Sequence, residues 1–89
     1  MERVFTPREL DRSLSRRRAT EHLAAQFAAK EALVKASGLS PSWRGIEVLH
    51  TPSGEPYFSQ LPGGLEPERV KLSLSHAAGL AVAIVLIED

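Results

Sequence analysis

The spacing of the apolar residues changes once along this chain, near Gly38, and this change limits the possible folds more than any other feature. Before Gly38, apolar residues recur every three or four positions, which is typical of amphipathic helices. From about residue 46 onward they alternate with polar residues in short runs, separated by turns that contain Gly and Pro. Helices followed by strands predict an α+β domain in which two helices pack on an antiparallel sheet.

The first part of the chain predicts a short helix and then a long one. Thr6 can cap a helix, the proline after it suits the first helical position, and Glu9 completes a capping box. We expect this helix to end at residues 13–15. The long helix should span about residues 20–36 and stop where Gly38 can adopt the left-handed conformation.

The long helix carries charged residues close to its expected core face. At about 100° per residue, the predicted core stripe consists of Leu23, Phe27 and Val34. Lys30 falls almost on this stripe. A neighbouring stripe begins with two alanines and ends in Glu31 and Lys35. A helix with a simple solvated face would place these charges on the far side.

Four later segments predict strands, over residues 46–50, 57–61, 70–76 and 80–87. The first two should form a hairpin. The third places Val70, Leu72, Leu74 and His76 on one face. The fourth reads LAVAIVLI and is apolar on both faces, so we expect a central strand that is covered on both sides.

The size and composition of the chain exclude several classes of protein. Its 89 residues, 43% apolar and 25% charged, predict a single domain over residues 1–89 with a thin core, for which self-association is a reasonable expectation. A net charge of zero gives no field to attract nucleic acid, and no apolar run approaches the roughly 20 residues of a membrane-spanning helix. The absence of cysteine excludes a thiolate site and fits a reducing compartment. We therefore expect a soluble, cytoplasmic protein.

Glu31 and Lys35 allow two interpretations. Because they are four residues apart, they can form an exposed helical ion pair worth about 0.2–0.5 kcal/mol. Alternatively, Glu31 can bind Mg²⁺, and Lys35 can contact phosphate oxygens or protonate a leaving group.

Other basic residues also allow two interpretations. His76 is either a core or edge residue with a satisfied hydrogen bond, or a contact for phosphate or water at the end of its strand. The arginine cluster at residues 16–18 is either solvated or a phosphate site, since guanidinium groups match phosphate oxygens. His22 and His50 have no comparable context, and we expect both on the surface.

Three stretches resemble one enzyme family: FAAKEALVKA (residues 27–36), IEVLHTPSGEPYFS (46–59) and KLSLSHAAGLAVAIVLIE (71–88). They make nearly the whole chain similar to holo-acyl-carrier-protein synthase, the small type of 4′-phosphopantetheinyl transferase. The resemblance implies Mg²⁺-dependent transfer of the phosphopantetheine arm of coenzyme A to a serine of apo acyl carrier protein, with release of 3′,5′-ADP. It also implies a homotrimer with sites between subunits.

The resemblance assigns catalytic roles to three residues. Glu31 would be a metal ligand and, through water, part of the base. Lys35 would contact the pyrophosphate and assist the leaving group. His76 would lie at the nucleotide end of the site.

The resemblance also assigns residues to the binding of coenzyme A. Arg17 and Arg18 would contact its 3′-phosphate. The turn that contains Ser53, Gly54 and Pro56 would lie near the adenine.

The sequence departs from the family pattern in two places. The family's usual first strand, which carries a second metal-binding aspartate, has no counterpart before residues 1–4. Gln26 stands where the family often has a phosphate-binding arginine. The missing strand is consistent with a start assigned too late, with a fragment or one half of a split enzyme, or with a shortened relative of low activity.

Two alternatives from other functional classes stay open. One is a non-catalytic module that binds coenzyme A or a carrier protein. The other is a small interaction domain in which Glu31 and Lys35 only pair with each other.

Overall fold

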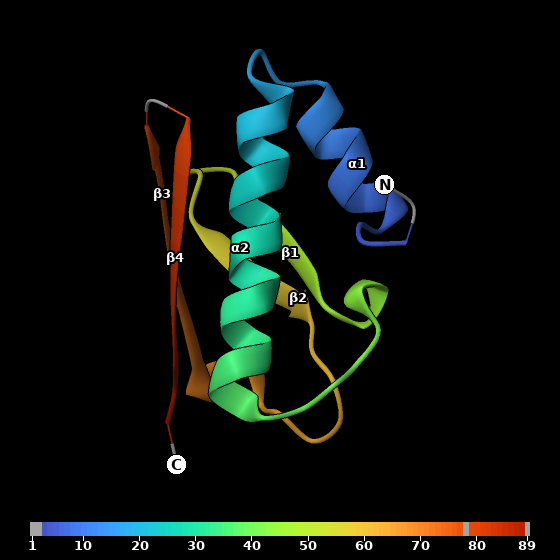
Figure 1. The fold of residues 1–89 in the computed structure, drawn as a ribbon, viewed down its shortest axis with the longest axis vertical. Helices are drawn as coiled ribbons and strands as arrows, with labels where there is room; N and C mark the ends of the chain where they lie inside the picture. The colour runs from blue at the N-terminus through green and yellow to red at the C-terminus, as the bar shows by residue number, and fades with distance from the viewer. Residues whose placement is uncertain (1–2, 78, 89) are drawn as a thin grey trace.

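The computed structural model describes residues 3–77 and 79–88. Helix α1 spans Pro7–Leu14 and helix α2 spans Ala19–Ser37. Two hairpins follow, β1 (Glu47–His50) with β2 (Pro56–Gln60), and β3 (Val70–Ala77) with β4 (Leu80–Ile87). Figure 1 shows α2 at the centre, with the β3–β4 hairpin on one side of it and α1 on the other.

Both helix starts and stops agree with the sequence prediction to within a residue or two. The Thr6 hydroxyl accepts a hydrogen bond from the Glu9 N–H at 3.2 Å, and the Glu9 carboxylate accepts one from the Thr6 N–H at 2.8 Å. This is the predicted capping box. At the end of α2, Gly38 has φ 73°, a left-handed conformation that other residues adopt only with strain.

The strands form two antiparallel hairpins among the described residues, and no single sheet joins them. In the second hairpin Val70 pairs with Ile87 and Ala77 with Leu80, without a register shift. The inward residues of this hairpin pack against a buried cluster contributed by α2, β1 and the residue before it, β2 and β3: Ala29, Leu33, Ile46, Val48, Phe58 and Val70. The α+β class is therefore confirmed, with α2 as the element that both hairpins share.

The expectation that residues 80–87 form a central, covered strand is wrong for this chain. Strand β4 pairs with β3 alone among the described strands, and α2 covers only its inner face. The outer face exposes Leu80, Val82, Ile84 and Leu86, by 66%, 46%, 58% and 63%. Four large apolar side chains thus stand in a row with nothing from the described chain over them.

The core face of α2 is also broader than predicted. Leu23 is buried, but Phe27 and Val34 are half-buried, and the most deeply buried apolar positions are Ala29 and Leu33. The physical reason is that α2 packs against α1 and β1 on one side and against β3–β4 on the other. A helix that other elements cover on two sides buries more than one stripe of side chains.

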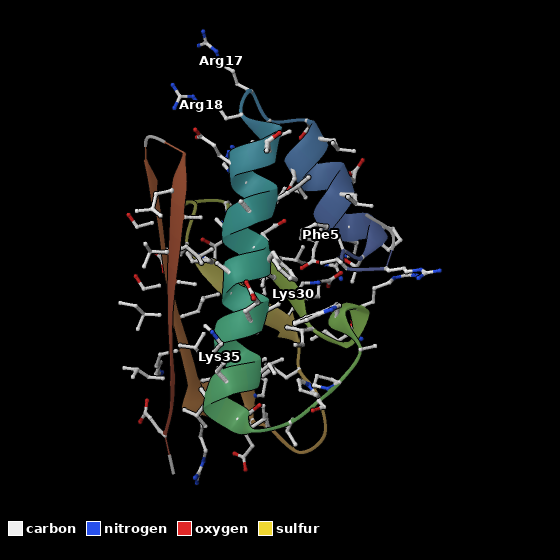
Figure 2. The ribbon with its side chains drawn as sticks, in the orientation of Figure 1. Phe5, Arg17, Arg18, Lys30 and Lys35 are labelled. Atoms are coloured by element: carbon white, nitrogen blue, oxygen red, sulfur yellow. The ribbon has the colours of Figure 1, made fainter. Side chains whose placement is uncertain are left out.

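Lys30 is completely buried and holds α1 against α2. Its Nζ donates to Glu9 Oε1 at 2.7 Å and to the backbone carbonyls of Val4 and Trp43 at 2.6 and 3.0 Å. The other oxygen of Glu9 accepts from the Val48 N–H at 2.7 Å. Figure 2 shows Lys30 on the side of α2 that faces α1, close to Phe5. Burial lowers the pKa of Lys30, and the hydrogen bond with Glu9 opposes that shift.

Candidate functional site

Glu31 and Lys35 lie on an exposed part of α2. Neither side chain forms a hydrogen bond or an ion pair with any described residue, so the helical ion pair, one of the two interpretations of the sequence, is not seen. Figure 2 shows Lys35 on the lower half of α2, on the side next to the β3–β4 hairpin. A carboxylate and an ammonium group are therefore both available to a ligand.

A cavity of about 450 Å³ opens beside the first half of α2. Its walls come from the end of α1, the start of α2, the turn between β1 and β2, and one residue of β3. The lining residues are Arg12, Arg16, His22, Ala25, Gln26, His50, Thr51, Pro52, Ser53, Gly54, Pro56 and Leu74. The lining contains two arginines and two histidines, and no carboxylate.

Two of these basic groups are buried without a partner. Arg12 Nη1 and His50 Nδ1 are both shielded from solvent, and neither has a hydrogen-bond partner among the described residues. Burial, followed by the charges of Arg12, His22 and Arg16, lowers the pKa of His50 to about 4. Burial and the charge of Arg16 also lower the pKa of Arg12. The cavity lining thus carries the positive charges of Arg12 and Arg16, with no carboxylate among the lining residues.

Gln26 lines this cavity, but both polar atoms of its side chain already form hydrogen bonds within the protein. Its Oε1 accepts a hydrogen bond from the Ser13 hydroxyl at 2.9 Å, and its Nε2 donates to the Val48 carbonyl at 3.4 Å. Through these two hydrogen bonds Gln26 joins α2 to α1 and to β1. All three residues are buried. Gln26 therefore shapes the cavity wall.

The structure brings together only some of the predicted binding residues. Ser53, Gly54 and Pro56 all line the cavity, as one face of the β1–β2 turn. Arg17 and Arg18 do not line it, and Figure 2 shows both projecting from the corner between α1 and α2, away from the rest of the fold.

Two of the three histidines do not lie where the sequence predicts. The backbone of His76 pairs with Ala81 in the β3–β4 hairpin, and the side chain of His76 lies outside the described part of the structure. His22 and His50 were expected on the surface, and this is wrong, because both are half-buried in the cavity wall. His50 ends its strand directly before the turn with Ser53, and that adjacency was the available signal in the sequence.

The cavity and the exposed charged pair face opposite sides of α2. Glu31 follows His22 by nine residues, and Lys35 follows Gln26 by nine. Nine residues make two and a half turns of helix, or about 180°. Within one copy of the chain, the charged pair and the cavity therefore lie on opposite faces of α2.

The described residues contain no group of three or more acidic, histidine or cysteine side chains that could enclose a metal ion. Glu31 is a single free carboxylate. That fits Mg²⁺, which often binds one or two protein carboxylates and takes its other ligands from water and phosphate. No described helix is long and apolar enough to cross a membrane.

Comparison with known proteins places the chain in a family. The model of the 4′-phosphopantetheinyl transferase superfamily matches residues 1–85. Holo-[acyl-carrier-protein] synthase of Chloroherpeton thalassium is 42% identical over 94 residues, covering 99% of this chain and 78% of that protein. The corresponding protein of Moorella thermoacetica is 40% identical over 96 residues, covering 98% and 75%.

Solved structures agree. The crystal structure of holo-[acyl-carrier-protein] synthase from Neisseria meningitidis matches with a TM-score of 0.84 at 32% identity, over 99% of this chain and 78% of that one. The Chronobacterium ammoniagenes ACPS–CoA complex matches with a TM-score of 0.80 at 33% identity, over 98% and 78%. The sequence match and the shared fold agree over nearly the whole chain, which therefore belongs to the 4′-phosphopantetheinyl transferase superfamily.

Proposed function

We propose that this chain transfers the 4′-phosphopantetheine group of coenzyme A to a serine of an apo acyl carrier protein, giving holo carrier protein and 3′,5′-ADP. The family match over residues 1–85 supports the reaction class. The observation that carries the proposal to this chain is that Glu31 and Lys35 on α2 are exposed and have no partner among the described residues. A transfer site needs such a carboxylate and such an ammonium group free to act on the substrate.

In the proposed reaction the carrier serine oxygen attacks the phosphorus that bears the pantetheine arm. A new P–O bond forms to serine, and the anhydride P–O bond breaks with its electron pair leaving on 3′,5′-ADP. The serine proton passes to water held by the Glu31 carboxylate. The Lys35 ammonium contacts the pyrophosphate and stabilises, or protonates, the leaving phosphate.

Mg²⁺ is part of this proposal, and Glu31 is the residue of this chain that would hold it. When bound, the ion would neutralise charge on the pyrophosphate oxygens.

We further propose that the active form is a homotrimer with sites between subunits. The exposed row Leu80, Val82, Ile84 and Leu86 is a surface that a second copy can bury, and small domains gain stability from such burial. Glu31 and the cavity lie on opposite faces of α2, and this also supports sites that are shared between subunits. If the cavity of one copy faced Glu31 and Lys35 of its neighbour, both ends of coenzyme A could be held. The absence of cysteine is consistent with a cytoplasmic location for this assembly.

Mass spectrometry of an apo carrier protein incubated with the chain, coenzyme A and Mg²⁺ tests the proposal. We expect a mass gain of one phosphopantetheine group, and we expect Glu31→Gln and Lys35→Met each to reduce the rate at least 100-fold while the fold is kept. Glu68→Gln is a matched control, because Glu68 is an exposed acid outside the proposed site. Equal rates for the Glu31 and Glu68 variants would contradict the proposed chemistry.

A non-catalytic relative that only binds coenzyme A is the second candidate, and the exposed Glu31 and Lys35, which form no ion pair with each other, do not by themselves separate it from the enzyme. It predicts heat of binding by calorimetry, little dependence on Mg²⁺, and no mass gain at high protein concentration.

A further inference from the structure

Two polar side chains of α2, Gln26 and Lys30, are buried one helical turn apart and tie the helix to its surroundings. They are 1% and 0% exposed, and every polar atom of both side chains forms a hydrogen bond within the protein. Lys30 alone reaches three segments, because its ammonium group donates to Glu9 of α1, to Val4 before α1 and to Trp43 between α2 and β1. These contacts use all three donors of the ammonium group.

The two ties form a closed frame with α1 and β1. The carbonyl group of Val48 accepts from Gln26 at 3.4 Å, and the N–H of Val48 donates at 2.7 Å to Glu9, the partner of Lys30. Gln26 also accepts from Ser13 of α1 at 2.9 Å. Because the two points of attachment on α2 are about 6 Å apart along the helix axis, they fix both the height and the rotation of the helix.

The Lys30–Glu9 pair is not explained by stability alone. The cost of burying two charged groups can exceed the gain from their attraction, and apolar residues of similar size often hold two helices together at least as well. Buried ionic groups are retained in some proteins because they select one arrangement over others. Here the arrangement is specified by three hydrogen bonds of 2.6, 2.7 and 3.0 Å, which are both short and directional.

The proposed reactive residues follow these ties directly along the helix. Glu31 is next to Lys30 in the chain, and Lys35 is one turn further on. They project about 100° and 140° away from Lys30 around the helix axis, since consecutive residues differ by about 100°. Figure 2 shows Lys30 on the side of α2 that faces α1, and Lys35 on the side next to the β3–β4 hairpin. The face on which Lys30 is held therefore sets the direction of the Glu31 carboxylate.

A small rotation of α2 would displace that carboxylate by a chemically significant distance. Side-chain ends lie about 5–6 Å from the axis of an α-helix, so a rotation of about 10° moves them by about 1 Å. A misplacement of about 1 Å can lower a reaction rate about 100-fold. The flexible side chain of Lys35 can follow such a rotation more easily than the shorter side chain of Glu31.

We propose that the buried Lys30–Glu9 pair is a positioning device for the transfer site, which fixes the rotation of α2 and so holds the Glu31 carboxylate in its reactive position. Lys30 and Glu9 touch no substrate in this proposal and are positioning residues. The inference rests on the proposed function for the role of Glu31. It adds that the reactivity of α2 depends on α1 and on the two backbone carbonyls that Lys30 contacts.

A neutral version of the pair tests the proposal. The double variant Glu9→Gln with Lys30→Met keeps the size of both side chains and removes the ion pair. We expect kcat of the transfer reaction to fall about 10- to 100-fold at a temperature at which circular dichroism shows the variant to be folded. Leu33→Ala is the matched control, because it weakens the packing of the same helix at a completely buried position and removes no side-chain hydrogen bond. It should keep kcat within about threefold of the wild type.

A second variant covers the case in which the neutral pair does not fold. Lys30→Arg keeps a cation opposite Glu9, but a planar guanidinium group cannot reproduce three hydrogen bonds that converge on one nitrogen atom. We expect a folded protein whose kcat is at least about tenfold lower. A kcat within twofold of the wild type, for either variant of the pair, overturns the inference.

A double-mutant cycle with Glu31 separates positioning from a general loss of structure. If the pair acts through Glu31, then its removal should change the residual rate of Glu31→Gln by less than about threefold, because the group to be positioned is already absent. A general effect on the fold would instead lower the Glu31→Gln rate by the same factor as it lowers the wild-type rate. That multiplicative result overturns the inference and leaves the transfer reaction standing.

A structural measurement gives an answer that does not depend on the reaction. Residual dipolar couplings of the backbone N–H groups report the rotation of α2 relative to α1 in solution. We expect α2 of the neutral pair to be rotated by about 10° or more, and α2 of Leu33→Ala to keep the wild-type orientation. Unchanged couplings in the neutral pair overturn the inference. A rotated α2 in a chain whose wild type gives no mass gain on the carrier protein supports the tie and contradicts the proposed function.

Discussion

Replacement of Lys30 by methionine should be the most damaging single substitution in α2. Methionine keeps the length of the side chain but removes all three hydrogen bonds, one to Glu9 and two to backbone carbonyls. Glu9 would stay completely buried and would lose its cationic partner, keeping the N–H groups of Thr6 and Val48. Removing one side of a buried ion pair costs about 3–5 kcal/mol.

That cost is large for a domain of this size. Globular domains are stable by only about 5–15 kcal/mol, and small ones lie at the lower end. We therefore expect Lys30→Met to be partly unfolded at room temperature, as measured by urea denaturation followed by circular dichroism. Lys35→Met is the matched control, because it is the same substitution on the same helix at an exposed position without a partner. It should change the free energy of unfolding by less than about 0.5 kcal/mol.

The double variant Glu9→Gln with Lys30→Met separates the ion pair from simple packing. It removes both charges of the Glu9–Lys30 pair, so it should recover part of the stability that Lys30→Met loses. The reasoning is refuted if Lys30→Met costs less than about 1 kcal/mol, or if the double variant is the less stable of the two.

Three further predictions concern other parts of the molecule. The pKa of His50 is about 4 in the folded chain and near 6.5 when unfolded, so between these values the unfolded state binds more protons. The free energy of unfolding should thus fall on acidification from pH 6.5 to 4, by at most about 1.4 kcal/mol per pH unit, and His50→Gln should flatten that slope in urea titrations at several pH values. Ile84→Asp should convert the proposed trimer to monomer in light scattering, since it places a charge in the exposed apolar row of β4, whereas an unchanged mass would contradict the trimer surface. Gly38→Ala should lower the free energy of unfolding by about 1 kcal/mol and thus the melting temperature, because the φ of 73° strains any residue with a Cβ. An unchanged melting temperature would count against the left-handed cap.

The local elements of this protein could be predicted from the sequence because their signals are local. The capping box at Thr6 and Glu9 and the left-handed Gly38 depend on residues within one turn of helix, and both are present as expected. Alternation along β3 likewise placed Leu72 and Leu74 inward and Ser73 outward. The family resemblance followed from three stretches that can be read directly in the sequence, residues 27–36, 46–59 and 71–88.

The cavity and the buried ion pair could not be predicted, because each joins segments that are distant in the sequence. Lys30 finds Glu9 across 21 positions, and Arg12 meets His50 only because α1 and β1 both pack on α2. The exposed row on β4 was misjudged for a related reason. An apolar strand looks the same in sequence whether a second layer of its own chain or another molecule covers it, and only the packing of α2 on one face showed that this chain leaves the other face open.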